Sequence, residues 1–318
     1  MPILPMILKT IDAHASGGPL RLVVDGFPAP RGKTMAEKAE WAESHADDLR
    51  CALILEPRGH ANMCGAVLTE PASPGAHAGV LFFHNTGFSP LSGHGILGVT
   101  RIALDRGLVM PGGNGSTVIF DTAAGTVRAT ADVERVSFVN VPSYVLHPGV
   151  RVEFGPRPLR ADIAYGGALY AIVDAEAAGL SIDARHAPEL SRAGVAIREA
   201  LKRVQPVDGT IFTGAPHEAG ADLRNVVVFA DGAVERSPSG TATSAVMAVL
   251  DAMGLLGGDR PFVHESILGT RFEGRLLGRT MVGDYPALTT EIAGEAWITG
   301  EHTFVVDDRD PLKKGFRI

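Results

Sequence analysis

Two stretches of this 318-residue sequence align without a gap: SGHGILGVTRIALDRGLV, residues 92–109, and SGTATSAVMAVLDAMGLL, residues 239–256. Each begins with Ser-Gly, continues with apolar residues at helical spacing and few charges, and reaches Gly-Leu after the same number of residues. A glycine just past the last turn is a common helix end, so the matching start at equal length carries more weight. The pair predicts two buried helices, residues 93–106 and 240–253, and an internal repeat.

The rest of the chain is divided into short apolar runs by 38 glycines and 21 prolines. Runs of this length between turn residues indicate β-strands. We expect strands at residues 20–24, 51–55, 79–83, 117–120, 137–141 and 225–229. Two more helices are expected at residues 34–49, which are highly charged, and 186–204, where the apolar residues fall at helical spacing. These elements together predict an α+β fold.

The domain organisation follows from the repeat. We expect two similar halves, residues 1–150 and 151–298, each a β-rich shell around one central helix. The predicted boundary lies where five turn-forming residues cluster: Pro148, Gly149, Gly155, Pro156 and Pro158. The C-terminal segment, residues 299–318, is expected to pack back on the first half through a strand at 299–306.

Composition excludes several classes of protein. Hydrophobic residues make up 45% of the chain and charged residues 20%, with a net charge of −7 and no basic stripe, which argues against a nucleic-acid partner. No apolar run approaches the roughly 18 residues of a membrane span. Residues 3–8 are apolar but contain Pro5 and follow no cationic region, unlike a signal peptide. With two cysteines, Cys51 and Cys64, a disulfide scaffold is not expected, and we predict a cytoplasmic protein.

The starts of the two buried helices carry the candidate chemistry. A helix N-terminus presents unpaired backbone N–H groups and a positive dipole end, so two that face each other would hold a carboxylate. Ser92 and Ser239 would then approach a planar carbanion from its two faces. The N–H groups expected to hold the carboxylate belong to Gly93, His94, Gly240 and Thr241. Serine is also among the best N-cap residues, so plain helix capping is the structural alternative.

Other polar residues are candidates for proton transfer or substrate contact at the same site. His94 lies two residues after Ser92 and Glu235 four before Ser239, and Asp222 is a further acidic candidate just upstream of RNVVVF. The histidines show no HExxH-like pairing, so no metal is expected. The glycine pairs lack the strand-GxGxxG-helix context of a dinucleotide site.

Six blocks in order resemble the signatures of the proline racemase family, which includes hydroxyproline 2-epimerases and trans-3-hydroxy-L-proline dehydratases. They are EPRGHANM (56–63), HNTGFSPLSGHG (84–95), ADIAYGGALYA (161–171), RNVVVFADGAVERSPSGTATSA (224–245), HESILGTRF (264–272) and GEAWITGEHTFVVD (294–307). The resemblance implies a diaminopimelate-epimerase-like fold with the active site in the cleft between two α/β halves. It also implies neither metal nor organic cofactor, and a proline-type small molecule as substrate.

The chain departs from the family pattern at the two positions before the helix glycines. Racemases and epimerases of this family usually carry cysteine at both, whereas Ser92 and Ser239 stand here. Cys51 and Cys64 are expected to be packed strand residues, with Cys64 outside both helix openings. A thiol ionises far more readily than a serine hydroxyl, which needs a neighbouring base. Racemisation by two serines should therefore be slow.

Three functions remain open from the sequence. The first is dehydration of trans-3-hydroxy-L-proline, in which no proton need return to the α-carbon, with Ser92, Ser239, His94 and Glu235 as catalytic residues. The second is 4-hydroxyproline 2-epimerisation or proline racemisation by the same residues. The third is a binding protein for proline-like ligands that catalyses nothing. The protein is expected to be a monomer or a homodimer.

Overall fold

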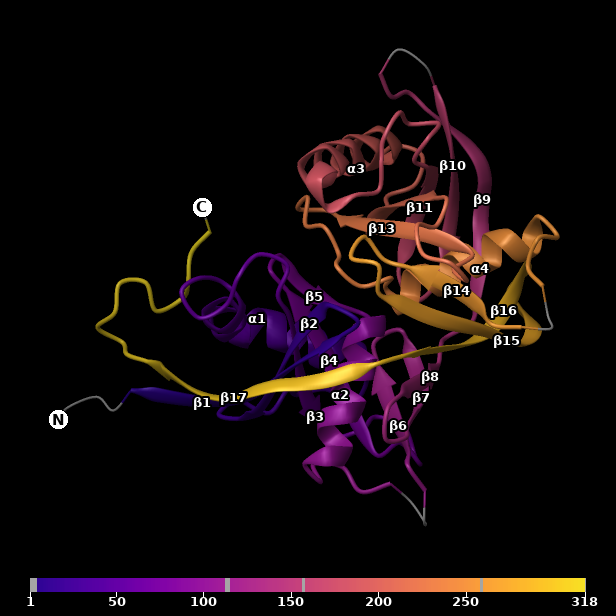
Figure 1. Cartoon of the computed structure of the whole chain (residues 1–318). Coiled ribbons are helices and arrows are strands. Elements are labelled where there is room, and N and C mark those ends of the chain that lie inside the picture. Colours follow the sequence, from indigo (N-terminus) through magenta and orange to yellow (C-terminus); the bar gives the residue numbers. More distant parts are fainter. Residues whose placement is uncertain (1–4, 112–114, 156–157, 258–259, 318) are drawn as a thin grey trace. The chain divides into compact units, whose positions relative to one another are not determined.

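The computed structural model describes residues 5–111, 115–155, 158–257 and 260–317. The chain forms two compact units, and Figure 1 follows it through both by colour. Unit 1 consists of Met1–Val136 together with Glu295–Ile318, and unit 2 of Ser137–Gly294.

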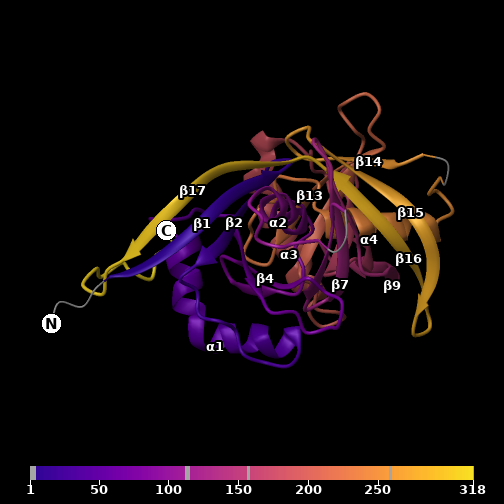
Figure 2. The ribbon, with the colours of Figure 1, turned by 90° about the horizontal axis from the view of Figure 1, so that it is seen from below.

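Unit 1 contains a mixed sheet that combines strands from both ends of the chain. At one end of it, β17 (Ala296–Val306) pairs antiparallel with β1 (Met6–Ala15), and β1 pairs antiparallel with β2 (Gly18–Asp25). Figure 2 shows β1 and β17 running side by side. The sheet continues through β3 (Cys64–Thr69), β4 (Ala78–His84), β6 (Thr117–Thr122) and β7 (Gly125–Ala131), and β5 (Gly87–Ser89) also pairs with β4.

The first helix of unit 1, α1 (Met35–Ile54), is longer than predicted. Thr34 caps it: its hydroxyl accepts a hydrogen bond from the Glu37 N–H, and the Glu37 carboxylate accepts one from the Thr34 N–H. The strand expected at residues 51–55 is wrong, because residues 51–54 form the last turn of α1. Leu53 is buried on the same face of the helix as Ala42, so the helical period of buried residues continues to the end of α1.

The second helix, α2 (Gly93–Asp105), confirms the helix predicted after Ser92. All its residues from Gly93 to Ala103 are buried, and it contacts β1, β2, β3, β7 and β17. Gly98 allows β2 to approach closely, because a Cβ there would lie 2.6 Å from the Leu20 side chain. A helix that is apolar on all sides is stable only inside a core, and α2 has that position in unit 1.

Eight of the strands described in unit 2 pair in a closed ring. The pairs run from β9 (Ser143–Val152) through β10 (Leu159–Tyr165), β11 (Leu169–Asp174), β12 (Gly209–Gly214), β13 (Leu223–Phe229), β14 (Phe262–Glu265), β15 (Arg271–Val282) and β16 (Tyr285–Gly294). β16 then pairs with β9, and the short β8 (Val136–Val139) also pairs with β16. Two of the ring pairings, β11–β12 and β13–β14, are parallel.

The boundary predicted at residue 150 falls inside a strand. Pro148 and Gly149 belong to β9, which runs to Val152 and pairs with β10. Gly149 takes a positive φ of 60°, and its N–H donates a hydrogen bond to the Asp162 carboxylate. The pairing shifts register along this strand, so Pro148 and Gly149 lie in an irregular strand, not a linker.

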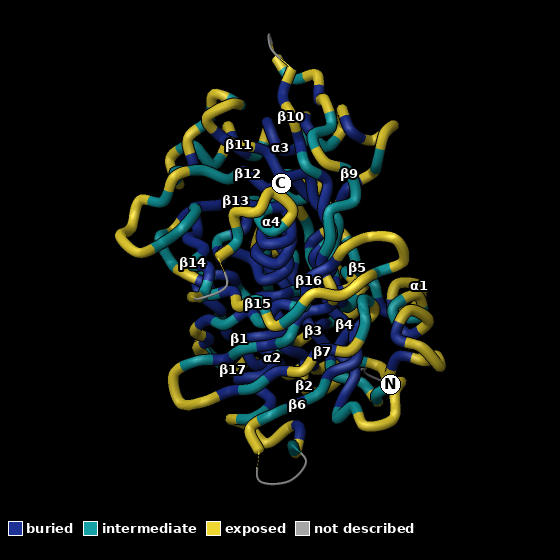
Figure 3. The backbone as a smooth tube through the Cα atoms, turned by 90° about the vertical axis from the view of Figure 1, so that its right-hand side faces the viewer, coloured by how far each residue is buried: buried dark blue, intermediate teal, exposed yellow. Residues whose placement is uncertain are grey.

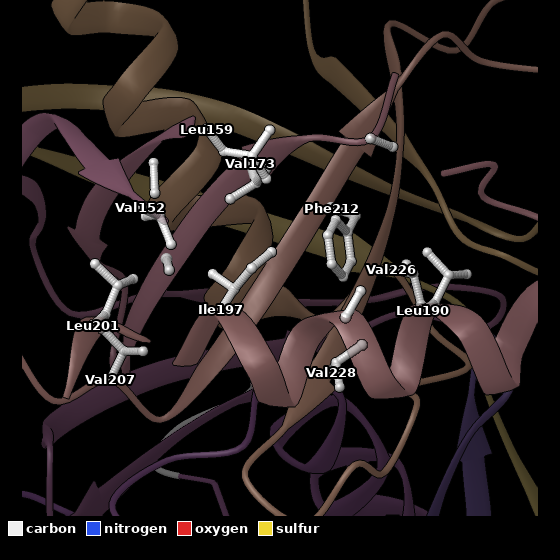
Figure 4. Close-up of a cluster of buried hydrophobic side chains, with 14 of the residues drawn as sticks. Val152, Leu159, Val173, Leu190, Ile197, Leu201, Val207, Phe212, Val226 and Val228 are labelled. Carbon is white, nitrogen blue, oxygen red and sulfur yellow. The ribbon is translucent and has the colours of Figure 1, made fainter. Parts of the chain in front are cut away.

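Two helices complete unit 2. α4 (Gly240–Ala252) has every residue from Gly240 to Val249 buried, contacts β9, β10, β11, β15 and β16, and is drawn largely dark blue in Figure 3. α3 (Ala187–Leu201) follows a 3-10 turn, η1 (Ala184–His186), and covers β12 and β13 with one face. Figure 4 shows Leu190 and Ile197 of α3 packing on the cluster around Phe212. None of the helices in the described residues combines the length and apolar character needed to cross a bilayer.

Candidate functional site

Ser92 stands at the N-cap of α2, as predicted. Its backbone is extended, with φ −125° and ψ 114°, and its Oγ accepts a hydrogen bond from the Gly95 N–H at 3.2 Å. Gly95 must lack a side chain, because a Cβ there would lie 2.8 Å from this Oγ and 2.6 Å from the Phe82 ring. His94 is buried in the same first turn. The sequence SGHG thus places a half-buried hydroxyl and a buried imidazole at one helix start.

Cys64 lies beside Ser92, contrary to the expectation that it would lie outside both helix openings. Its thiol is 3.6 Å from the Ser92 Oγ and is 8% exposed. Cys64 is the first residue of β3, where it pairs with Leu20 of β2, and both strands contact α2. This register brings the thiol to the start of α2 across a separation of 28 residues.

Cys51 has a different environment. It lies in α1, where its sulfur accepts a hydrogen bond from Arg50 at 3.1 Å and lies 3.7 Å from the Asp47 carboxylate. Burial raises the pKa of the Cys51 thiol, and the Asp47 charge adds to that effect against the opposing Arg50 charge. Cys51 is therefore held as a neutral thiol within α1.

Ser239 stands at the N-cap of α4 in a strained conformation. Its φ of 58° and ψ of 120° lie outside the regions that side-chain-bearing residues prefer. Its N–H donates to the Ser237 hydroxyl at 3.2 Å, and its Oγ accepts from the Ala242 N–H at 3.4 Å. Strain of this kind costs on the order of 1–3 kcal/mol and is concentrated at functional sites.

A second hydroxyl and a phenol adjoin Ser239. The Thr241 Oγ1 lies 3.2 Å from the Ser239 Oγ and 2.8 Å from the Tyr170 hydroxyl. Tyr170 belongs to β11 and is 2% exposed. Burial raises the pKa of the Tyr170 phenol, so it remains protonated at neutral pH. Thr241 was predicted through its backbone N–H, but neither its side chain nor Tyr170 was singled out from the sequence.

Glu235 is part of the turn that leads into α4. Its carboxylate accepts hydrogen bonds from the N–H groups of Arg236 and Ser237, both at 2.9 Å, and it is buried. Because Ser237 in turn accepts from the Ser239 N–H, Glu235 helps to hold the strained N-cap. The structure therefore brings Glu235, Ser239 and Thr241 together in unit 2.

Asp222 does not join this group. Its carboxylate is paired with Arg260, accepts a hydrogen bond from the Val263 N–H at 2.8 Å, and lines a surface pocket with Leu250 of the last turn of α4. Although burial raises the pKa of Asp222, the hydrogen bonds from Arg260 and the Val263 N–H lower it overall. Ser239 stands at the opposite end of the helix, so Asp222 has a structural role here.

A buried histidine supports the first turn of α4 from the side of β14. The His264 Nδ1 lies 3.0 Å from the Thr243 hydroxyl, which donates to the Ser239 carbonyl oxygen at 2.8 Å. Burial lowers the pKa of His264 from 6.5 to about 3. The imidazole is therefore neutral at physiological pH and acts as a hydrogen-bonding partner of the turn.

The lowered pKa of His264 predicts that the folded chain loses stability on acidification. Between pH 6.5 and about pH 3 the unfolded chain binds a proton at His264 that the folded chain does not. Stability therefore rises with pH in this window and is lost on acidification, by roughly 1.4 kcal/mol per pH unit at most. Urea unfolding at a series of pH values should show a shallower slope for His264→Gln than for the parent. His45→Gln, which removes an exposed histidine, is the control, and equal slopes for all three proteins would contradict the assignment.

Among the described residues, no group of three or more His, Cys, Asp and Glu side chains is arranged to hold a metal ion. The side chains at the two helix starts offer hydroxyls, one thiol, an imidazole and a carboxylate. Such groups can hold an anion at backbone N–H groups and move a proton beside it.

Comparison with known proteins gives consistent matches along the chain. A family model described as "Proline racemase" matches residues 10–317. A trans-3-hydroxy-L-proline dehydratase of Bacillus cereus is 42% identical over 326 aligned residues, covering 98% of this chain and 98% of that protein. A proline racemase of Clostridioides difficile is 38% identical, with 97% of each chain covered.

The fold matches a solved structure equally well. A hydroxyproline epimerase from Agrobacterium vitis, with bound trans-4-hydroxy-L-proline, superposes with a TM-score of 0.91 at 28% sequence identity. The match covers 98% of this chain and 95% of that chain. The α+β architecture predicted from the sequence is therefore shared with a solved hydroxyproline epimerase.

Proposed function

Because this chain belongs to the proline racemase family, we propose that it is a hydro-lyase that removes water from trans-3-hydroxy-L-proline. The observation that carries the proposal is a hydroxyl, not a thiol, at the start of each buried helix, Ser92 on α2 and Ser239 on α4. The relative from Bacillus cereus, which carries this activity in its name, supports the choice of substrate.

We propose that the two units are related halves of the diaminopimelate-epimerase type, each built around its buried helix. The substrate would be bound by the first turns of α2 and α4. Its carboxylate would accept hydrogen bonds from the N–H groups of the two first turns, where helix dipoles favour an anion. Those groups belong to Gly93, His94, Gly240 and Thr241.

The proposed elimination moves one proton off the α-carbon and one hydroxide off the neighbouring carbon. The α C–H bond breaks and its electrons form the Cα=Cβ bond, while the C–O bond breaks and the leaving oxygen takes a proton to become water. The resulting enamine rearranges to the cyclic imine carboxylate. Proton transfer by Ser92 and Ser239 needs neighbouring groups, and we assign that role to His94 and Glu235, with Cys64 beside Ser92.

Epimerisation of a 4-hydroxyproline is the second candidate. It is favoured by the solved epimerase with trans-4-hydroxy-L-proline and by the Cys64 thiol, the one thiol in contact with either serine. It requires a proton to be returned to the opposite face of the α-carbon. A serine hydroxyl without an adjacent thiol, as at Ser239, is poorly suited to that exchange at neutral pH.

Incubation in heavy water separates these functions. The purified protein would be given trans-3-hydroxy-L-proline, trans-4-hydroxy-L-proline and L-proline separately. We expect imine formation from the 3-hydroxy substrate and little deuterium at the α-carbon of the other two. Deuterium uptake with inversion of the 4-hydroxy substrate, and no imine, would replace the dehydratase proposal with an epimerase. Binding of any of the three without either reaction would indicate a ligand-binding protein.

A further inference from the structure

Three hydroxyl groups form a line at the start of α4. The Tyr170 hydroxyl lies 2.8 Å from the Thr241 Oγ1, which lies 3.2 Å from the Ser239 Oγ. The three residues are 2%, 2% and 3% exposed. Solvent therefore has little access to them, and each hydroxyl proton is directed by its neighbours.

Either oxygen can be the donor in each of the two contacts. Burial raises the pKa of Tyr170, so its phenol keeps a proton to donate. We infer the direction in which Tyr170 donates to Thr241 and Thr241 donates to the Ser239 Oγ, because a phenol is a stronger donor than an aliphatic alcohol. The Ala242 N–H donates to the same oxygen at 3.4 Å. With both lone pairs used as acceptors, the Ser239 hydroxyl has only its proton left to offer.

We propose that Tyr170 and Thr241 are positioning residues that fix Ser239 as the proton donor of the elimination. This deepens the dehydratase function proposed above and rests on it. As the C–O bond of the substrate breaks, the Ser239 proton passes to the departing oxygen and completes the water molecule. The α-proton goes to a group at the start of α2. After product release this group loses the proton to solvent, and Ser239 regains a proton from solvent.

The Thr241 hydroxyl and the Ala242 N–H also lower the activation free energy of this proton transfer. Negative charge develops on the Ser239 Oγ as its proton leaves, and the Thr241 hydroxyl, the Ala242 N–H and the α4 dipole all stabilise it. Loss of one donor that directly contacts a developing oxyanion costs roughly a hundred- to a thousandfold in kcat. Removing the Tyr170 hydroxyl leaves the Thr241 and Ala242 donors in place, so we expect a smaller loss, about ten- to hundredfold.

The test compares Tyr170→Phe, Thr241→Val and Thr241→Ser with the parent protein on trans-3-hydroxy-L-proline. We expect Tyr170→Phe and Thr241→Val to lower the kcat of elimination with little change in KM, because the N–H groups that hold the carboxylate remain. Thr241→Ser, which keeps the hydroxyl, should retain most of the activity. Tyr165→Phe removes a phenol that lies outside the line and is the matched control. Thermal melting of each variant measures any effect on the fold.

The α-proton gives an independent measurement. Exchange of the substrate's α-proton with heavy water depends on groups at the start of α2. The Tyr170→Phe variant should therefore exchange this proton at the parental rate while it eliminates water more slowly. Equal kcat values for Tyr170→Phe and the parent, equal activities of Thr241→Val and Thr241→Ser, or a change confined to KM would each overturn the positioning role. A parent protein that eliminates no water from trans-3-hydroxy-L-proline would overturn the dehydratase function itself, and this role with it.

Discussion

The double substitution Ser92→Cys with Ser239→Cys should raise the rate of α-proton exchange of a proline-type substrate by roughly a hundred- to ten-thousandfold. A thiol ionises near neutral pH when it lies at a helix N-terminus, whereas a serine hydroxyl does not. Both N-cap side chains already accept hydrogen bonds from the first turns of their helices, so the new thiols would have the same donors. Deuterium incorporation at the α-carbon of L-proline and trans-4-hydroxy-L-proline measures the gain.

The design of this variant must take Cys64 into account. A thiol introduced at position 92 would lie beside the existing Cys64 thiol, whose sulfur is 3.6 Å from the Ser92 Oγ. Oxidation of the pair would remove both thiols from the chemistry. The variant is therefore made with Cys64→Ala as well as alone, and assayed with a reductant. Cys51→Ala, in α1, is the control. If exchange stays at the parental rate in all these proteins, the two N-cap positions do not contact the α-carbon.

The second large effect is expected from removing either hydroxyl. Ser92→Ala or Ser239→Ala should lower the rate of imine formation from trans-3-hydroxy-L-proline by roughly a hundred- to ten-thousandfold, the usual contribution of a positioned acid or base. Ser239→Ala should spare α-proton exchange, since Ser239 serves the leaving oxygen, whereas Ser92→Ala should lower exchange as well.

Loss of a helix cap also costs about 1 kcal/mol of stability, so activity is measured well below the melting temperature of each variant. Ser44→Ala and Ser191→Ala remove hydroxyls from α1 and α3 and serve as controls in the two units. Should the N-cap variants eliminate water as fast as these controls, the serines would be helix caps and nothing more.

The two buried helices were predictable because local rules agree with the fold. The apolar stripes of residues 93–106 and 240–253, the Ser-Gly starts and the Gly-Leu ends all specify helices within one turn of those observed. The place of Glu235 in the turn before α4 was predictable for a similar reason, since it lies in the same short segment as Ser239. Such signals are contained within about 20 residues and need no knowledge of the tertiary structure.

Two of the contacts that the sequence did not reveal are long-range. Cys64 reaches Ser92 through strand register, and Tyr170 reaches Thr241 across 71 residues. The last turn of α1 was predicted as a strand because a short apolar run fits either structure until its helical period is followed from upstream. Asp222 was proposed for its position beside a signature block, yet its partner is Arg260, which lies 38 residues further along the chain.

The pairing of β1 with β17 has a consequence for synthesis of the chain. Met6 pairs with Val306, so the sheet of unit 1 is complete only when the chain as far as Val306 has left the ribosome. The ring of unit 2, in contrast, is encoded by one continuous segment, Ser137–Gly294. During translation one edge of β1 stays unpaired until β17 has been synthesised. An unpaired strand edge can pair with strands of other chains. Premature termination directly after Gly294 would leave this edge of β1 unpaired permanently, so this truncated product should aggregate even though unit 2 is intact.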